Sequence, residues 1–119
     1  MKLRLLIVED EMLVAMLAED MATALGHLVV GVAGSLARGL ELAERADFDL
    51  AMLDVNLAGQ TSEPIADLLE RRGTGFFFVT GYGLAGLSPR HRNRVVLPKP
   101  YDEGGLAAAI AEASNTRRV

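Results

Sequence analysis

The sequence predicts an α/β fold in which five parallel strands form one sheet between two layers of helices. Five short apolar runs alternate with helical or turn-like segments, a pattern typical of a doubly wound parallel sheet. The first and third runs are apolar at almost every position, as expected of strands covered on both faces. Half of the 119 residues are apolar, so we expect one domain, residues 1–119, with a core of its own.

The first half of the chain predicts two strands and two helices. The apolar run from Leu3 to Val8 stops abruptly at an acidic triplet and predicts the first strand. Residues 11–25 predict a helix that ends at Gly26. We expect its buried face to consist of residues spaced four apart, widened by their neighbours: Leu13, Leu17, Met21 and Leu25, with Met12, Val14 and Met16. Residues 29–32 predict the second strand, and Ser35 is expected to cap a helix that ends near Ala46.

The third strand is the apolar run of residues 48–54, which ends on the carboxylate of Asp54. Residues 56–62 have a turn-like composition. Ser62, Glu63 and Pro64 then give the order of cap, acid and proline that begins many helices, and this helix is expected to end near Arg72.

The last part of the chain predicts two strands and one regular helix. Residues 76–79 and 95–97 are apolar and predict the fourth and fifth strands. Between them, residues 84–92 contain Gly86 and Pro89, so we expect the fourth helix to be short or irregular. Asp102 is expected to cap the final helix.

Composition excludes several classes of function. A net charge of −4 with only two lysines argues against nucleic acid as a partner, because such binding needs a cationic face. No cysteine is present, so disulfides and thiolate-bound metals are excluded. The apolar run at the N-terminus is too short for a signal peptide or a membrane span, and we expect a cytoplasmic protein. Arg90, His91, Arg92 and Arg94 form a local basic patch that we interpret as a solvated loop.

Polar side chains follow four of the five predicted strands. In an open parallel sheet, ligands bind at the carboxyl ends of the strands, where the strand order reverses. With the order 2-1-3-4-5, Glu9 and Asp10 after the first strand lie beside Asp54 after the third. Thr80 and Lys99 follow the fourth and fifth strands. We therefore expect these five side chains to converge at one edge.

This set of residues favours phosphoryl chemistry. Three neighbouring carboxylates repel one another unless a cation lies among them, and oxygen ligands without His or Cys suit Mg²⁺. A hydroxyl from Thr80 and an ammonium from Lys99 suit phosphoryl oxygens, since phosphoryl transfer depends on positioning and charge neutralisation. The pattern indicates a site that receives a phosphoryl group on Asp54.

The same residues carry a resemblance to a known family. Glu9-Asp10, Asp54, Thr80 and Lys99-Pro100, in this order and at these spacings, resemble the receiver domain of two-component response regulators over essentially the whole chain. The resemblance implies a flavodoxin-like fold. It also implies a phosphoacceptor signalling domain rather than an enzyme, which takes its phosphoryl group from a histidine kinase or a His phosphotransfer protein.

The resemblance further implies details of the site. Mg²⁺ would be held by Glu9, Asp10, Asp54 and the backbone carbonyl of Asn56. The peptide bond between Lys99 and Pro100 would be cis, an isomer that is accessible mainly before proline.

The sequence departs from the common receiver pattern at the residues expected to relay the signal. Many receivers carry an aromatic residue at the position of Val96. Residues 78–82, Phe-Val-Thr-Gly-Tyr, are instead similar to the Phe-Ala-Thr-Gly-Tyr motif of a subgroup of single-domain receivers with a remodelled fourth helix. We hypothesise that Thr80, Gly81 and Tyr82, with the loop after them, form the moving element.

Two alternatives stay open. A Mg²⁺-dependent phosphatase resembling the haloacid dehalogenase group would also use an aspartyl nucleophile, but it needs an acid two residues later, where this chain has Asn56. A receiver-like module that binds a partner without being phosphorylated is the second. Because no residues are left for an output domain, we expect the signal to leave by contact with a downstream protein.

Overall fold

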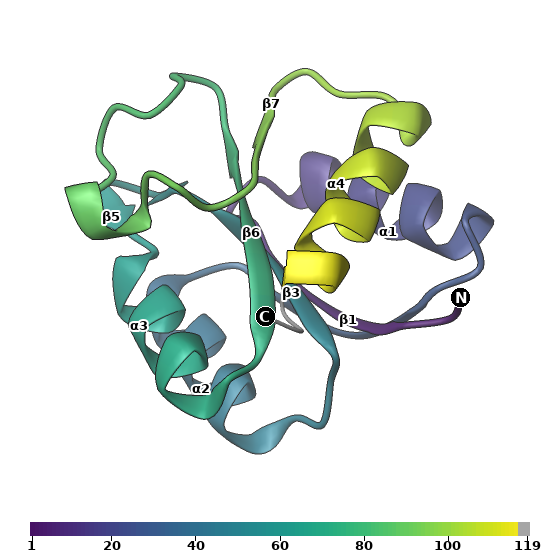
Figure 1. Cartoon of the computed structure of the whole chain (residues 1–119), viewed down its shortest axis with the longest axis horizontal. Coiled ribbons are helices and arrows are strands. Elements are labelled where there is room, and N and C mark those ends of the chain that lie inside the picture. Colours follow the sequence, from purple (N-terminus) through teal and green to yellow (C-terminus); the bar gives the residue numbers. More distant parts are fainter. Residues whose placement is uncertain (117–119) are drawn as a thin grey trace.

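A computed structural model describes residues 1–116 and contains the predicted five-stranded parallel sheet. Its strands are β1 (Arg4–Val8), β2 (Leu28–Ala33), β3 (Leu50–Asp54), β6 (Gly75–Thr80) and β7 (Val96–Pro98) (Figure 1). They lie in the order β2-β1-β3-β6-β7, which confirms the predicted order. The segment expected to be a turn contains a small antiparallel ribbon of β4 (Asn56–Leu57) and β5 (Gln60–Thr61), outside the main sheet.

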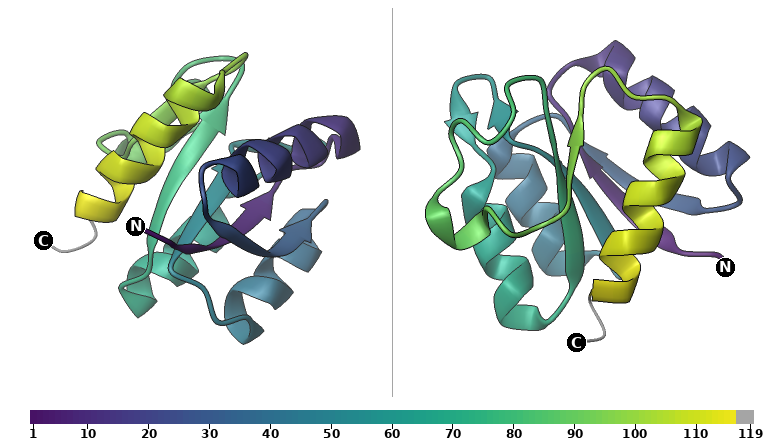
Figure 2. Two further views of the ribbon diagram at one scale, coloured as in Figure 1. Left: turned by 90° about the vertical axis from the view of Figure 1, so that its right-hand side faces the viewer. Right: turned by 45° about the horizontal axis from the view of Figure 1, so that its top comes forward.

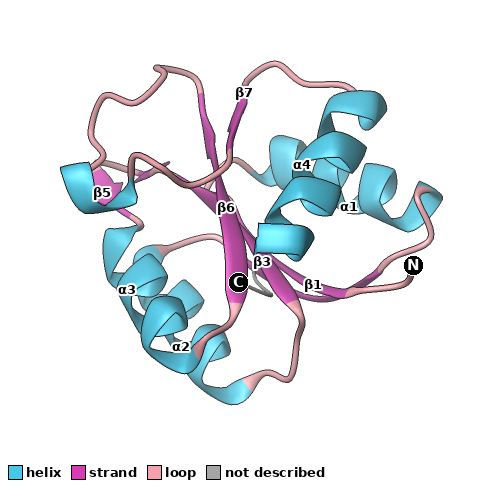
Figure 3. Ribbon diagram, viewed as in Figure 1, coloured by secondary structure: helices cyan, strands magenta, loops and turns pink. Residues whose placement is uncertain are grey.

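Four helices cover the two faces of the sheet. They are α1 (Met12–Ala24), α2 (Leu36–Arg45), α3 (Glu63–Arg72) and α4 (Glu103–Thr116). Figures 1 and 2 show α1 and α4 together on one face and α2 and α3 on the other. Between β6 and β7 the chain forms only a 3₁₀ turn, η1 (Pro89–His91), which confirms the expected irregular segment (Figure 3). Within residues 1–116, no helix has the length and apolar character that a membrane span requires.

The core consists of two apolar layers separated by the sheet. All five residues of β3 are buried, and so are all six of β6. Phe77 belongs to the layer beneath α1 and α4, whereas Phe76 and Phe78 belong to the layer beneath α2 and α3 and meet edge to face at 5.5 Å. Alternate side chains of β6 therefore pack into both layers of the core. This packing on both faces fixes the position of the strand and of its carboxyl end.

The prediction for the buried face of α1 was wrong at its N-terminal half, whereas Met21 and Leu25 are partly buried and pack against the core as expected. Leu13 and Leu17 are 75% and 58% exposed, and Met12 and Met16 are also exposed. The buried residues are Ala15, Ala18 and Ala22. Their spacing of three and four follows the helical repeat, whereas a strict spacing of four drifts away from one face. Small residues therefore provide the fully buried contacts, and four of the large ones form an exposed apolar ridge: Met12, Leu13, Met16 and Leu17.

Most helix starts are as the sequence indicates. Ser35 accepts a hydrogen bond from the amide of Arg38 at 3.1 Å, and Asp102 accepts one from the amide of Gly105 at 2.8 Å. Helix α3 begins at Glu63 as expected, but the hydroxyl of Ser62 is buried and has no hydrogen-bond partner among residues 1–116. The peptide bond between Lys99 and Pro100 is cis.

Gly39 marks the place where α2 packs against α3. A Cβ atom there would lie 2.5 Å from Cδ1 of Ile65 and 3.2 Å from Cγ1 of Val8. Both neighbours are completely buried, so they have little room to move. Gly39, which the sequence suggests only as a weak point in a helix, is therefore a packing requirement.

We expect Gly39→Ala to lower the free energy of unfolding by about 1–2 kcal/mol, because overpacking outweighs the gain in helix propensity. The matched control is Gly104→Ala in α4, where a Cβ atom would meet nothing closer than 3.6 Å. That change should raise the free energy of unfolding by about 0.5 kcal/mol. Urea unfolding followed by circular dichroism measures both, and a stabilising Gly39→Ala would contradict the packing argument.

Candidate functional site

The five predicted site residues converge at the carboxyl edge of the sheet. Glu9 and Asp10 follow β1, Asp54 ends β3, Thr80 ends β6, and Lys99 follows β7. Above them lies an open cleft of about 330 Å³. Its lining consists of Asp10, Glu11, Asp54, Asn56, Thr80, Gly81, Tyr82 and Lys99. The sheet order predicted from the sequence is what brings these distant residues together.

Three carboxylates and one ammonium lie together in and just beneath the cleft. Oxygens of Glu9, Asp10 and Asp54 lie within 4.8 Å of one another. The Nζ atom of Lys99 lies 2.7 Å from Oε1 of Glu9 and 3.2 Å from Oδ2 of Asp54. Glu9 is buried beneath the cleft, so one of its roles is to hold Lys99 beside Asp54. The cluster thus holds three carboxyl groups but only one ammonium, which contacts Glu9 and Asp54, and such a cluster attracts a further cation.

The β4–β5 ribbon shapes the second wall of the cleft. Its turn places Ala58 at a φ of 53° and Gly59 at 88°, and the Ala58 amide donates to Oδ2 of Asp10 at 3.1 Å. The side-chain oxygen of Asn56 accepts a hydrogen bond from the Gly59 amide at 2.9 Å. The Asn56 side chain is thus engaged in the turn, while its backbone follows directly on the strand that carries Asp54.

Burial and charge raise the pKa of Asp54 to about 7. Loss of solvent is the largest cause and the neighbouring carboxyl of Glu9 adds to it, whereas Lys99 acts in the opposite direction. Burial alone would lower the pKa of Lys99, but Glu9 and Asp54 outweigh it and the pKa of Lys99 is raised. Lys99 therefore stays charged, but its charge is not enough to let Asp54 ionise at the ordinary pH of an aspartate.

Thr80 connects the cleft to the irregular segment. Its hydroxyl oxygen accepts a hydrogen bond from the Tyr82 amide at 3.0 Å, and its carbonyl oxygen accepts one from the Lys99 amide at 2.8 Å. The Tyr82 ring is 79% exposed at the rim. Val96 lies in β7, half-buried against the layer beneath α2 and α3. Of the switch candidates, Thr80, Gly81 and Tyr82 are adjacent to the cleft and Val96 is not among its lining residues.

Two features near the site were not predicted. Tyr101, with Pro100, lines an apolar groove shared with α1, and its pKa is raised by burial. The interpretation of residues 90–94 as a solvated basic patch was wrong for His91, which is completely buried, whereas Arg90 and Arg92 are exposed as expected. Arg90 and Arg94 form ion pairs with Asp67 and Glu70 of α3. The acidic residues on one face of the predicted third helix were the sequence signal that could have indicated partners for these basic residues.

Known proteins resemble this chain over most of its length. The curated regulator PhyR of Methylorubrum extorquens is 31% identical over 117 residues, 95% of this chain and 44% of PhyR. The solution structure of SdrG from Sphingomonas melonis is 41% identical with a TM-score of 0.82, over 91% of this chain and 92% of SdrG. The chain belongs to the response regulator receiver family. The Erythrobacter litoralis PhyR response regulator REC domain is 27% identical, with a TM-score of 0.82 over 94% of this receiver and 89% of that domain.

The extent of these matches differs between whole proteins and single domains. The receiver spans about half the length of the curated relatives it matches. No protein family profile matches the chain. The fold and the family are thus established by relatives, whereas the roles of individual residues rest on the geometry of the cleft.

The raised pKa of Asp54 predicts a pH effect on stability. Because the folded chain holds this proton more tightly than the unfolded chain, folding binds protons between about pH 4 and 7 and the free energy of unfolding falls as the pH rises. Between pH 5 and 8, with EDTA present, the wild type should lose roughly 2 kcal/mol more than Asp54→Asn. Urea unfolding at both pH values measures this. Asp20→Asn, on an exposed position of α1, is the control and should behave like the wild type.

Proposed function

We propose that this receiver accepts a phosphoryl group on Asp54 in a Mg²⁺-dependent reaction and passes the signal on by protein contact. The observation that carries the proposal is the cleft at the carboxyl edge, where three carboxylates, Lys99 and Thr80 meet. Asp54 lies at its centre with the ammonium of Lys99 3.2 Å away. This arrangement places an acceptor oxygen of Asp54 next to the positive charge of Lys99.

The donor set fits Mg²⁺. Carboxylate oxygens of Glu9, Asp10 and Asp54 lie close enough to act on one ion, and this cluster contains no nitrogen or sulfur ligand. Asn56, which lines the same cleft, would add its carbonyl oxygen. When bound, Mg²⁺ supplies the positive charge that the carboxylates lack and that phosphoryl oxygens require. It would also lower the pKa of Asp54, so the acceptor would be ionised at neutral pH.

The chain's own residues then perform the transfer. The ionised Asp54 directs an oxygen at phosphorus, the new P–O bond forms as the bond between phosphorus and the donor nitrogen breaks, and the proton needed by the departing imidazole comes from solvent. Lys99 is positioned to neutralise a phosphoryl oxygen, because Glu9 holds its ammonium in place. The Thr80 hydroxyl, currently an acceptor for Tyr82, can donate to another phosphoryl oxygen.

The apolar ridge on α1 supports a protein as the donor. Met12, Leu13, Met16 and Leu17 are each more than half exposed, on the two helical turns that directly follow Glu9 and Asp10. Exposed large apolar side chains grouped on one helix face are typical of protein contact surfaces. We therefore infer that a histidine kinase or His phosphotransfer protein docks across this ridge in the cytoplasm, with its histidine above Asp54.

The alternatives have less support. A phosphatase would need an acid two residues after Asp54, and the side chain there is Asn56, whose oxygen is engaged by Gly59. A module that is never phosphorylated would not need the pair of half-buried Lys99 and buried Glu9, which is costly to maintain without a function. The single-domain subgroup with the Phe-Ala-Thr-Gly-Tyr motif remains the part of the family that residues 78–82 favour.

Acetyl phosphate tests the proposed acceptor. With Mg²⁺ present, intact-protein mass spectrometry should show a gain of one phosphoryl group, absent with EDTA and absent in Asp54→Asn. Asp10→Asn should weaken Mg²⁺ binding at least tenfold by calorimetry, since it removes one of few ligands.

The matched control is Glu11→Gln, which removes the same charge from the neighbouring residue of the cleft without touching the carboxylate cluster. It should change Mg²⁺ affinity less than threefold. Continuous release of phosphate from many phosphomonoesters would favour the phosphatase instead. No mass gain from acetyl phosphate or from any kinase of the source organism would favour the binding module.

The segment after Thr80 should respond to phosphorylation. If the Thr80 hydroxyl turns to the phosphoryl group, it releases the Tyr82 amide, and residues 81–86 are exposed and contain two glycines at positive φ. Amide exchange with and without the phosphoryl group should change most in residues 81–86. Thr80→Ala should still be phosphorylated but should lose most of this change. Unchanged exchange from Gly81 to Arg94 in the phosphorylated wild type would refute the switch.

A further inference from the structure

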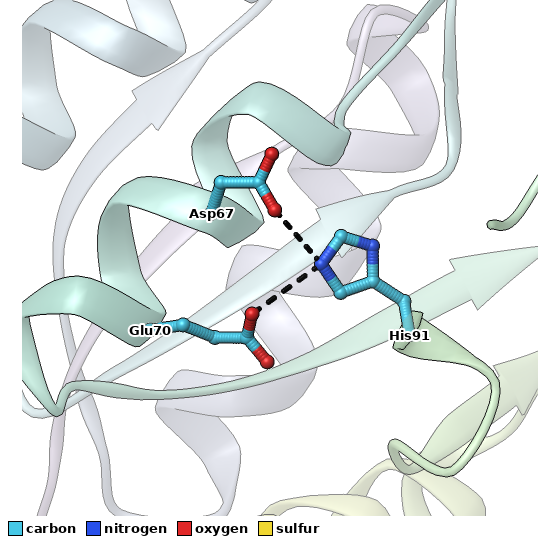
Figure 4. A group of neighbouring side chains, drawn as sticks. All are labelled: Asp67, Glu70 and His91. Atoms are coloured by element: carbon cyan, nitrogen blue, oxygen red, sulfur yellow. Dashed lines mark ion pairs between the residues drawn. The ribbon is translucent and has the colours of Figure 1, made fainter. Parts of the chain in front are cut away.

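His91 is a completely buried histidine near the end of the irregular segment between β6 and β7. It lies in η1, packs against the ring of Phe78 at 5.7 Å, and faces α3. Three acidic residues of α3 point at it, at spacings that place them on one helix face: Glu63, Asp67 and Glu70. Figure 4 shows two of these carboxylates reaching one ring nitrogen of His91 from either side.

The proton on the other ring nitrogen can be assigned from its surroundings. Nδ1 of His91 lies 2.7 Å from Oε2 of Glu63. Glu63 also accepts hydrogen bonds from the amide and the hydroxyl of Ser88, at 2.8 and 3.0 Å. Burial alone would raise the pKa of Glu63, but the bonds from His91 and Ser88 outweigh it and the pKa is lowered. Glu63 is thus an ionised acceptor, and Nδ1 carries the proton that it accepts.

The remaining nitrogen, Nε2, is left in an unfavourable position. It lies 3.1 Å from Oδ1 of Asp67 and 3.5 Å from Oε1 of Glu70. Despite these short distances, it has no hydrogen-bond partner of acceptable geometry among residues 1–116. In the neutral ring, Nε2 presents a lone pair to two carboxylate oxygens. A cation held between the three atoms would turn this repulsion into attraction.

The spacing of the three atoms fits a first-row divalent metal. Zn²⁺ bonds to imidazole nitrogen and carboxylate oxygen are about 2.0–2.1 Å long, which in a tetrahedron places neighbouring ligand atoms about 3.3–3.4 Å apart. The two distances from Nε2, 3.1 and 3.5 Å, lie on either side of that value, and all three ligand atoms lie within 4.8 Å of one another. A carboxylate that holds the other nitrogen of a ligating histidine is the usual outer partner in such sites, and Glu63 occupies that position.

We propose that Asp67, Glu70 and His91 form a binding site for a divalent metal of the zinc class, with Glu63 orienting the imidazole. Arg90 and Arg94 bind two of these carboxylates from outside. Arg90 donates to both oxygens of Asp67, and Arg94 donates to Oε2 of Glu70. They leave Oε1 of Glu70 directed at Nε2. Two guanidiniums against three carboxylates leave one net negative charge around the imidazole. The bound metal would tie η1 to α3 and hold the end of the irregular segment in place.

Zinc titration in excess Mg²⁺ tests the site, because Mg²⁺ competes for the oxygen-only cleft but not for an imidazole nitrogen. Calorimetry should show one Zn²⁺ bound per chain. Glu70→Gln, which changes an exposed ligand, should lower the affinity for Zn²⁺ at least tenfold. Glu44→Gln, an equivalent change at an exposed position of α2, should leave the affinity for Zn²⁺ unchanged. Thermal unfolding should show a higher Tm with Zn²⁺ for the wild type and Glu44→Gln but not for Glu70→Gln.

Imidazole nitrogen NMR identifies the ligand directly, because the chain has only two histidines. One equivalent of Zn²⁺ should move the Nε2 resonance of His91 to a metal-bound position. His27 is the internal reference, since its Nδ1 accepts a hydrogen bond from Leu3 at 3.1 Å and its resonances should not move. Two outcomes would overturn the proposal. One is Zn²⁺ binding that excess Mg²⁺ abolishes and Glu70→Gln does not affect, which would place the ion in the cleft. The other is a doubly protonated His91 that binds no zinc at neutral pH, which would show that the carboxylates around Nε2 hold a proton instead of a metal.

Discussion

The ion pairs of Lys99 with Glu9 and Asp54 are the interaction on which the site depends. Lys99 is 90 residues from Glu9 and 45 from Asp54, so only the order of the parallel strands brings the three together. Collecting carboxylates at one edge opposes folding, as the raised pKa of Asp54 records. The fully buried strands β3 and β6 supply the apolar burial that offsets this cost. The sheet thus holds a group of charges that would separate in a flexible chain.

Helix α1 shows how packing next to the site determines what its surface can do. Its buried residues are the alanines Ala15, Ala18 and Ala22, and small side chains let a helix approach its neighbours closely. The large apolar side chains of its first two turns are consequently directed outward, beside the acidic pair at the end of β1. A helix with leucines facing inward would leave a polar outer face and no ridge. The choice of small buried residues therefore affects both the core and the surface that a partner would meet.

The parts of the structure that follow from local patterns could be predicted from the sequence. Near-continuous apolar runs identified β1, β3 and β6, and the polar residue after each run identified the edge of the sheet where the cleft lies. The buried face of α1 could not be predicted in the same way, since alanines at Ala15, Ala18 and Ala22 compete with a more apolar stripe that has a less helical spacing. The environment of His91 depends on residues about 20 to 28 positions away in α3. Locally, its arginine neighbours suggest only a solvated surface.

The irregular segment between β6 and β7 is anchored unequally at its two ends. At its start, Tyr82 is held by one hydrogen bond to Thr80, and residues 81–86 are exposed. At its end, Leu87 is buried in the core, Ser88 donates twice to Glu63, and His91 is enclosed by α3. A rearrangement that begins at Thr80 can therefore displace the first half at little energetic cost, whereas the second half can move only if the contacts of His91 break. The acidic residues of α3 around His91 thus determine how far the motion can extend along the segment. A metal bound there would hold the second half more firmly in place.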